Sequence, residues 1–248
     1  MNRRIPAAVT IGVREFYRTP VLVAVLLVVP VFLIGAFVLL VPKTNIPVRL
    51  GETIATVSMP AYATVFETAV SVAILSGILG LFLVLSSEAA DDRLRLAGYS
   101  DLELVVARVG TLGTSVVVVT AVTVGVAVQV FQPANFWAFT AIVGLLGITY
   151  GVLGILVGLL LDKLGGVYVM LLVPFWDVHF LLFQNTLPSD LLWWTEYLPG
   201  HYATTALFDA AFTAGVEIDM VLGTIGYATV LTMLSIAVFY HITGSSHR

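Results

Sequence analysis

The sequence predicts an all-α integral membrane protein, and three observations support this fold class. Of the 248 residues, 59% are hydrophobic and only 10% are charged, whereas a soluble domain carries about 25% charged residues. The mean hydropathy is +1.04. Apolar residues also run continuously over stretches of about 20 residues, the length of one helical crossing, instead of alternating with polar residues as in a membrane barrel. We expect one transmembrane domain, residues 1–248, with six spans.

Residues 1–20 are expected to form an amphipathic helix in the headgroup layer. Basic residues occupy the other faces, which is typical of an interfacial helix. No small-residue cleavage site follows, which argues against a signal peptide. A plain basic flank of the first span is the alternative. The apolar positions at helical spacing are Ile5, Val9, Gly12, Val13 and Phe16.

The six spans follow in chain order, separated by short polar segments. Pro30 lies inside the first span, where neighbouring helices can satisfy the freed carbonyl. Residues 42–59 are expected to form a polar connector, residues 132–135 a short turn and Asp162-Lys163 a tight turn. We expect the spans at residues 21–41, 62–85, 109–131, 136–161, 167–183 and 220–242.

The distribution of positive charge orients the chain. Lys43 and Arg49 fall on one side of the predicted membrane, and the rest of the 11 Lys and Arg residues fall on the other. Cytoplasmic loops carry the excess of Lys and Arg. We therefore expect a multi-pass protein of the cell (plasma) membrane with both termini in the cytoplasm. The residues assigned to the cytoplasmic side are Arg3, Arg4, Arg14, Arg18, Arg93, Arg95, Arg108, Lys163 and Arg248.

Five glycines form one stripe along the fourth predicted span. Small residues let helix backbones approach closely in lipid. We interpret the stripe as tight packing inside one bundle, with a subunit interface or a moving seam as the alternatives. The glycines are Gly144, Gly147, Gly151, Gly154 and Gly158.

The segment 187–215 is apolar and aromatic, but it is too short and too often broken to cross the membrane. Pro199-Gly200 divides it into two short helical patterns. These predict a re-entrant pair that enters the outer leaflet before the last span. Trp193, Trp194 and Tyr197 would lie in the aromatic belt at the outer interface. The acids of this outer region are Asp190, Glu196, Asp209, Glu217 and Asp219.

Three ionisable residues lie inside predicted spans: Glu67, Asp177 and His179. An intramembrane charge costs ~2.5–3.5 kcal/mol on insertion scales, so such residues face a bundle interior or a wet cavity. Together with Trp176 they form a candidate substrate path or proton site, near Pro174, which could break the helix. The alternative is buried polar packing, with Asp177 protonated or paired with His179.

Sequence motifs of catalysis and cofactor binding are missing. Neither lysine follows a glycine, so no phosphate-binding loop is present. No His-Glu-x-x-His helix and no Gly-x-Ser-x-Gly elbow occurs, and the four histidines lie far apart. We expect no catalytic residue, no metal site and no cofactor bound by this chain, and a lipid bilayer as its surroundings with no nucleic acid partner.

One charged segment, residues 87–103, interrupts the apolar sequence between the second and third spans. Acidic residues at its start favour a helix dipole, and Gly98 can end that helix. The alternative is an ordinary solvated loop. The residues that we single out are Glu88, Asp91, Asp92, Arg93, Arg95, Gly98 and Tyr99.

The pattern resembles the membrane subunit (permease) of ABC-2 type ABC transporters, and this resemblance covers nearly the whole chain. It rests on the interfacial helix, the six spans, the charged segment and the re-entrant pair. The most specific match is Glu88 followed by residues 91–95, 98–100 and 103–108, and Leu198-Pro199 is also similar. The chain has Leu96-Ala97-Gly98-Tyr99 where the family often has a Thr-Pro pair.

The resemblance implies an export permease that pairs with a second copy or a paralogue and with two ABC ATPase subunits. ATP and Mg would bind to those partner chains, and residues 87–103 would be the coupling helix. The aromatic, acidic outer region suits a hydrophobic or cationic small molecule or a lipid better than a polysaccharide. The alternative function is an ion- or proton-coupled secondary transporter that uses Glu67, Asp177 and His179. A third hypothesis, an intramembrane enzyme, is disfavoured by the missing motifs.

Overall fold

The structure is a computed structural model that describes residues 10, 20–50, 53–85, 101–183 and 193–245. Most of the predicted interfacial helix lies outside these residues. So do the coupling residues from Glu88 to Tyr99 and the first part of the predicted re-entrant pair, through residue 192. Those expectations stay predictions.

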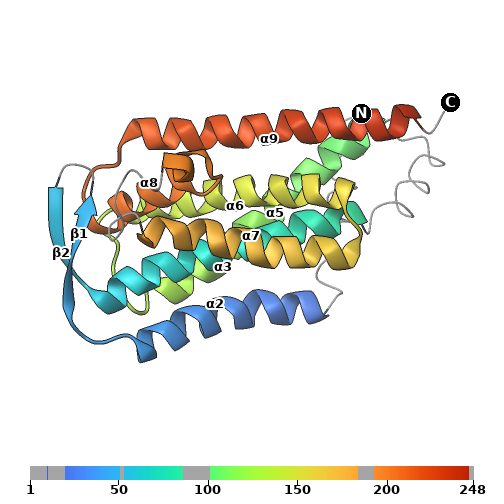
Figure 1. Ribbon diagram of the computed structural model, residues 1–248. Helices are drawn as coiled ribbons and strands as arrows, with labels where there is room; N and C mark the ends of the chain where they lie inside the picture. Colours follow the sequence, from blue (N-terminus) through green and yellow to red (C-terminus); the bar gives the residue numbers. More distant parts are fainter. Residues whose placement is uncertain (1–9, 11–19, 51–52, 86–100, 184–192, 246–248) are drawn as a thin grey trace.

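The described part of the chain is a bundle of α-helices with one β-hairpin (Figure 1). The helices are α2 (Pro20–Leu40), α3 (Met59–Leu85), α5 (Asp101–Ala127), α6 (Phe136–Leu160), α7 (Lys163–Phe183), α8 (His201–Phe212) and α9 (Ile218–Ser245). A short 3₁₀ helix, η2 (Trp193–Tyr197), precedes α8, and the strands are β1 (Asn45–Leu50) and β2 (Thr53–Ser58).

Four of the described helices are long and apolar enough to cross a membrane: Met59–Leu85, Ala107–Ala127, Phe136–Leu160 and Ile218–His241. A shorter apolar stretch covers Ala24–Leu40 in α2. Helix α7 has 21 residues but carries Asp177 and His179. The helical, membrane-type fold class is therefore confirmed in this coarse form, and the six-span arrangement stays a prediction.

The polar connector between the first two predicted spans folds as a β-hairpin, which was not predicted. Strands β1 and β2 pair antiparallel from Asn45 opposite Ser58 to Leu50 opposite Thr53. The sequence signal is the two-residue link Gly51-Glu52 between the strands, because glycine in the first position is typical of one tight hairpin turn. The hairpin lies at one end of the bundle (Figure 1).

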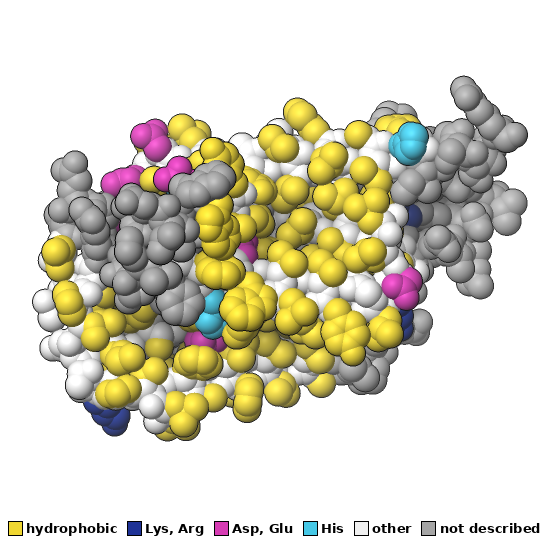
Figure 2. Space-filling view, viewed as in Figure 1, with side chains coloured by type: hydrophobic (Ala, Val, Ile, Leu, Met, Phe, Trp, Pro, Cys, Tyr) yellow, Lys and Arg dark blue, Asp and Glu magenta, His cyan; other side chains and the backbone are white. Residues whose placement is uncertain are grey.

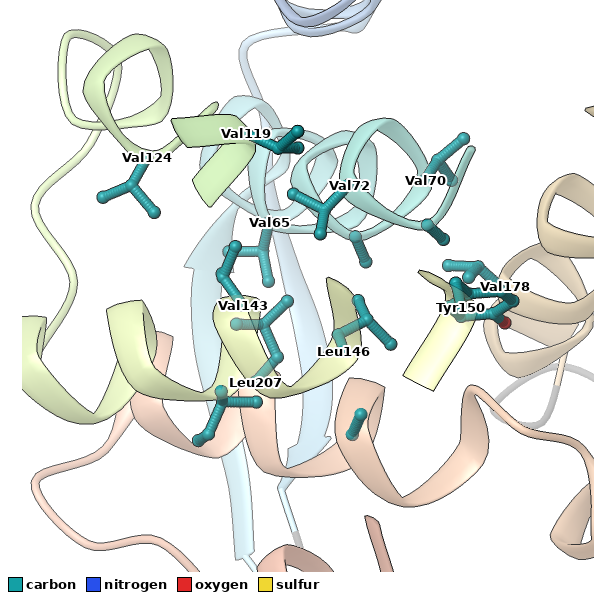
Figure 3. Packing of buried hydrophobic residues seen from close by; sticks show 14 of the residues in the cluster. Val65, Val70, Val72, Val119, Val124, Val143, Leu146, Tyr150, Val178 and Leu207 are labelled. Atoms are coloured by element: carbon teal, nitrogen blue, oxygen red, sulfur yellow. The ribbon is translucent and has the colours of Figure 1, made fainter. Parts of the chain in front are cut away.

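Helix α3 is the centre of the bundle. It packs against α2, α5, α6 and α7, and α6 packs in turn against α8 and α9. Figure 3 shows Val65 and Val72 of α3 among Val119 of α5 and Val143 and Leu146 of α6. These β-branched and leucine side chains of α3, α5 and α6 form one part of a core that also contains aromatic residues and side chains of α2, α7 and α8.

Helices α3 and α6 cross with their backbones in contact. A Cβ atom added to Gly80 would lie 1.9 Å from the carbonyl oxygen of Gly151, and one added to Gly154 would lie 2.0 Å from that of Gly77. Gly158 also meets Leu81 of α3. The predicted glycine stripe thus faces helices of the same chain, as tight packing inside one bundle requires.

The outer surface of the bundle is apolar. Exposed large hydrophobic side chains lie along α2, α5, α7 and α9. Figure 2 shows hydrophobic side chains over the middle of the visible face, with most of the visible charged side chains toward the two ends. A surface of this kind fits a lipid environment.

Candidate functional site

The candidate site is centred on α7, which remains helical through Pro174. The break that we considered at this proline is therefore absent. The helix carries Asp177 into the interior, where its side chain is 3% exposed. Trp176, the preceding residue, points outward and is 51% exposed. Of these two candidate path residues, only Asp177 belongs to the bundle interior.

Asp177 connects three elements through one carboxylate oxygen. Its Oδ2 accepts a hydrogen bond from the Tyr150 hydroxyl of α6 and another from the Gly200 amide at 2.9 Å. Gly200 is the N-cap residue of α8. The carboxyl group therefore lies at the positive end of the α8 dipole, which favours its charged form. We call Asp177, Tyr150 and Gly200 the latch.

The other oxygen of this carboxylate, Oδ1, is buried and has no hydrogen-bond partner among the described residues. The pairing of Asp177 with His179 was one form of the alternative that we considered, and in the structure Asp177 bonds instead to Tyr150 and Gly200. The His179 Nδ1 atom instead lies 2.6 Å from the Phe175 carbonyl oxygen. Residues two apart on a helix face different directions, so the sequence spacing itself disfavours that pair.

Helix α8 runs from the latch to the end of the bundle that carries the hairpin. At its outer end, the amides of Ala134 and Asn135 each donate to a carbonyl of α8, those of Ala211 and Ala210, both at 2.9 Å. Fifteen residue positions separate Asn135 from Tyr150, which is about 22 Å along α6. This half-helix therefore reaches deep into the bundle from one end, as the second part of the predicted re-entrant pair would.

The 3₁₀ helix η2 is held by α9. The Tyr227 hydroxyl donates to the Tyr197 carbonyl at 2.9 Å, and the ring of Trp194 packs edge to face on Phe180 of α7. The Tyr197 side chain is exposed. Two aromatic residues predicted for the outer belt thus also position the chain that leads into α8.

Glu67 lies in the interior of α3, 1% exposed. Its Oε1 atom has no hydrogen-bond partner among the described residues. The adjacent Phe66 ring packs edge to face on the His179 ring of α7 at 4.5 Å. Helices α3 and α7 are therefore in contact at Phe66 and His179. Asp177, also on α7, makes its hydrogen bonds elsewhere, to α6 and to the start of α8.

Sequence reasoning missed Tyr150, Gly200 and Tyr227. Tyr150 lies within the glycine-rich helix beside Gly151, so a large polar aromatic among small residues was a signal for an interior contact. Pro199-Gly200 was interpreted as a break between two helical patterns. The sequence did not show that the Gly200 amide donates to Asp177. Tyr227 carries no local pattern that separates it from other tyrosines.

Asp209, near the outer end of α8, has a shifted pKa. Burial raises the pKa of Asp209, and the Glu217 carboxylate raises it further, while the Glu217 amide that bonds to it lowers it. Burial and the neighbouring Glu217 carboxylate therefore both disfavour the charged form of Asp209.

The described residues contain no group of three or more His, Cys, Asp or Glu side chains that could hold a metal ion. What the site offers is hydrogen-bond acceptors buried in an apolar bundle. Such groups can bind a proton, a cation or a polar part of a substrate, or can hold a moving element in place.

No protein-family model matches the sequence, and the comparison with curated proteins finds no significant match.

Proposed function

We propose that the chain is the membrane-spanning permease subunit of an ATP-driven exporter of the ABC-2 type. In this proposal a second copy or a paralogue completes the pathway, and two ATPase subunits bind at the cytoplasmic end. Residues 87–103 transmit ATPase closure through Glu88, Asp91, Asp92, Arg93, Arg95, Gly98 and Tyr99. Both termini lie in the cytoplasm of a plasma-membrane protein.

The observation that carries the proposal is the order of elements along the chain. A dense charged segment separates the two apolar helices α3 and α5, and a buried half-helix, α8, precedes the last long helix. The sequence has no phosphate-binding loop, so an ATP-driven role needs a separate ATPase. A docking segment on the side rich in Lys and Arg supplies the contact for it.

The substrate that we propose is a hydrophobic small molecule or a lipid, moved outward. The helix surfaces are apolar, and the buried polar groups of the described interior are mostly threonine and serine hydroxyls, with the three carboxyls of Glu67, Asp177 and Asp209. A long polysaccharide would need many exposed hydrogen-bonding groups along its path. If a binding screen found that polysaccharide alone stabilises the chain, this substrate class would be wrong.

The test is the double charge reversal Asp92→Arg with Arg93→Asp in the complete transporter. We expect the chain to remain in the membrane, while ATPase binding is weakened and ATP hydrolysis no longer responds to transport substrate. The matched control is Lys43→Glu, a charge change two residues before strand β1 of the hairpin. If the double variant binds the ATPase and transports as the parent does, the docking role is wrong.

A second candidate function, ion- or proton-coupled secondary transport, is favoured by one specific observation. Glu67 and Asp177 each keep a buried carboxylate oxygen without a partner among the described residues. A carboxyl group in that state can take up a proton or a cation. Uptake into vesicles driven by an imposed ion gradient without ATP, and its loss in Glu67→Gln, would favour this function over the exporter.

A further inference from the structure

We propose that α8 is a displaceable plug whose inner end is held by the latch and whose outer end is hinged on the turn before α6. Release of Gly200 from Asp177 would let the inner end move away from α6 while the outer end stays in place. The proposal rests on four features of α8.

The first feature is that the latch concentrates its contacts on one atom. Both the Tyr150 hydroxyl and the Gly200 amide donate to Oδ2 of Asp177. Protonation of this carboxylate, its displacement by a ligand or a rotation of its side chain would therefore weaken both bonds together. A single event on α7 can thus release the start of α8 from α6 and α7.

The second feature is that the outer end is held by several backbone contacts. Ala134 and Asn135 donate to carbonyls of α8, and the Asn135 side-chain amide donates to the Ala214 carbonyl at 3.3 Å. Because most of these bonds join main-chain atoms on both sides, no one side-chain event removes them all. We call this set the hinge.

The third feature is the size of the buried side chains along α8. At the latched end the buried residues Ala203, Thr204 and Ala206 are small, so few side chains interlock there. The large contacts lie farther along: Leu207 is fully buried, and the Phe208 ring packs on Tyr62 at 5.0 Å. Pro199-Gly200 separates η2 from α8, and glycine there allows the chain to bend.

The fourth feature is that the inner end holds unsatisfied polar atoms. The Thr204 hydroxyl and Oδ1 of Asp177 are buried without hydrogen-bond partners among the described residues. Burying such atoms is unfavourable, and movement of α8 would allow water to reach them. The inserted position therefore carries an unfavourable contribution that opening relieves.

This inference rests on the proposed function in one respect, that release of α8 opens a path at this end of the bundle. The movement itself can be measured without transport. A failed docking test leaves the labelling result below unaffected, and a failed labelling test leaves the docking result unaffected.

The experiment uses single cysteines, because the sequence contains none. Ala203→Cys and Ala210→Cys lie seven residues apart, two turns along the same face of α8, and both alanine side chains are fully buried. The first reports on the latched end and the second on the hinged end. The full-length chain in lipid nanodiscs is treated with a water-soluble maleimide, and the labelling rate at each of the two positions is measured.

We then combine each of these variants with Asp177→Leu, which removes the acceptor, and with Asp177→Asn, which keeps an uncharged acceptor. Loss of a buried charged hydrogen-bond partner should lower the ratio of closed to open positions of α8 by about tenfold or more. We expect the labelling rate at position 203 to rise at least about tenfold with Asp177→Leu and by less with Asp177→Asn, while labelling at position 210 stays unchanged.

Unchanged labelling at position 203, or an equal rise at both positions in folded protein, would overturn the proposal. If Asp177→Leu does not fold, the labelling rates at positions 203 and 210 are compared in the Asp177→Asn variant instead, with the same criteria. Tyr150→Phe is a third variant: it removes one donor and leaves the Gly200 contact, so labelling at position 203 should rise less than with Asp177→Leu.

Discussion

The seam between α3 and α6 and the two ends of α8 hold helices together by different means. In the seam, glycines bring backbone against backbone, and a Cβ atom at Gly80 would lie 1.9 Å from a carbonyl oxygen. At α8, the latched end is held by small buried side chains and the bond from Gly200 to Asp177, and the larger Leu207 and Phe208 pack farther along the helix. The seam has no room to adjust, whereas we propose that the latched end of α8 can move. The bundle thus combines a rigid centre with a displaceable element.

The largest expected effect is on the seam. Gly80→Ala places a methyl group in steric clash with the Gly151 carbonyl oxygen. The clash can be relieved only if the backbones of α3 and α6 move apart. We expect a loss of about 3 kcal/mol or more in the free energy of unfolding, measured by denaturant titration in micelles. The matched control is Gly125→Ala, where no heavy atom lies within 4 Å and the change should be neutral or stabilising. Equal effects of the two variants would contradict the rigid seam.

The next effect tests the latch with a variant of the same type. A Cβ atom at Gly200 would lie 2.7 Å from the Tyr150 hydroxyl and 3.1 Å from Oδ2 of Asp177. Gly200→Ala should therefore cost about 1–3 kcal/mol, less than Gly80→Ala because side chains can move where backbones cannot. It should also raise labelling of the Ala203→Cys variant. Gly215→Ala, in open space, serves as the control, and a Gly200→Ala chain with parental stability and labelling would argue against the latch.

A smaller effect concerns the chain that leads into α8. Tyr227→Phe removes the hydroxyl that bonds to the Tyr197 carbonyl and should cost about 1 kcal/mol in thermal unfolding experiments. Tyr168→Phe, which alters an exposed tyrosine of α7, should leave stability unchanged. If the two variants behave alike, the contact between α9 and η2 contributes nothing to the position of α8.

The smallest effect is pH-dependent and concerns Asp209 near the hinge. Its pKa in the folded chain is raised, so the folded state binds the proton more tightly than the unfolded state does. Stability should therefore fall as pH rises from the ordinary value of 3.8 through the raised value. Asp209→Asn should remove this decline and stabilise the chain at neutral pH but not at low pH. A parallel pH profile of the variant and the parent, measured by thermal unfolding, would contradict this assignment.

The helices were predictable because membrane-type helices are recognisable from local sequence, as long apolar runs. The starts of the helices at Pro20, Met59 and Phe136 lie within three residues of the predicted starts. The hairpin was missed because its strands are short and mixed in polarity, and its Gly51-Glu52 link has only two residues. Helical continuity through Pro174 depends on neighbouring helices, which a sequence pattern does not contain.

The candidate site was predictable only in part. Asp177 and Glu67 were found because a charge inside an apolar run is conspicuous. Their partners were not found, since the Tyr150 hydroxyl comes from a residue 27 positions away and the Gly200 donor is a backbone amide that every residue except proline possesses. The interior position of the glycine stripe followed from its spacing, but its contact with Gly77 and Gly80 required the arrangement of two helices.

The glycine seam also constrains how the chain is made. Gly80 and Gly154, which belong to its two helices, are separated by 74 residues of sequence. Synthesis at roughly 5–20 residues per second means that α3 waits about 4–15 s for its partner to emerge. Throughout that interval α3 can pack against α2, which is made before it, but Gly77 and Gly80 lack the α6 backbone that they contact in the folded chain. The seam therefore forms late in synthesis, after α3 and α5 have already been made.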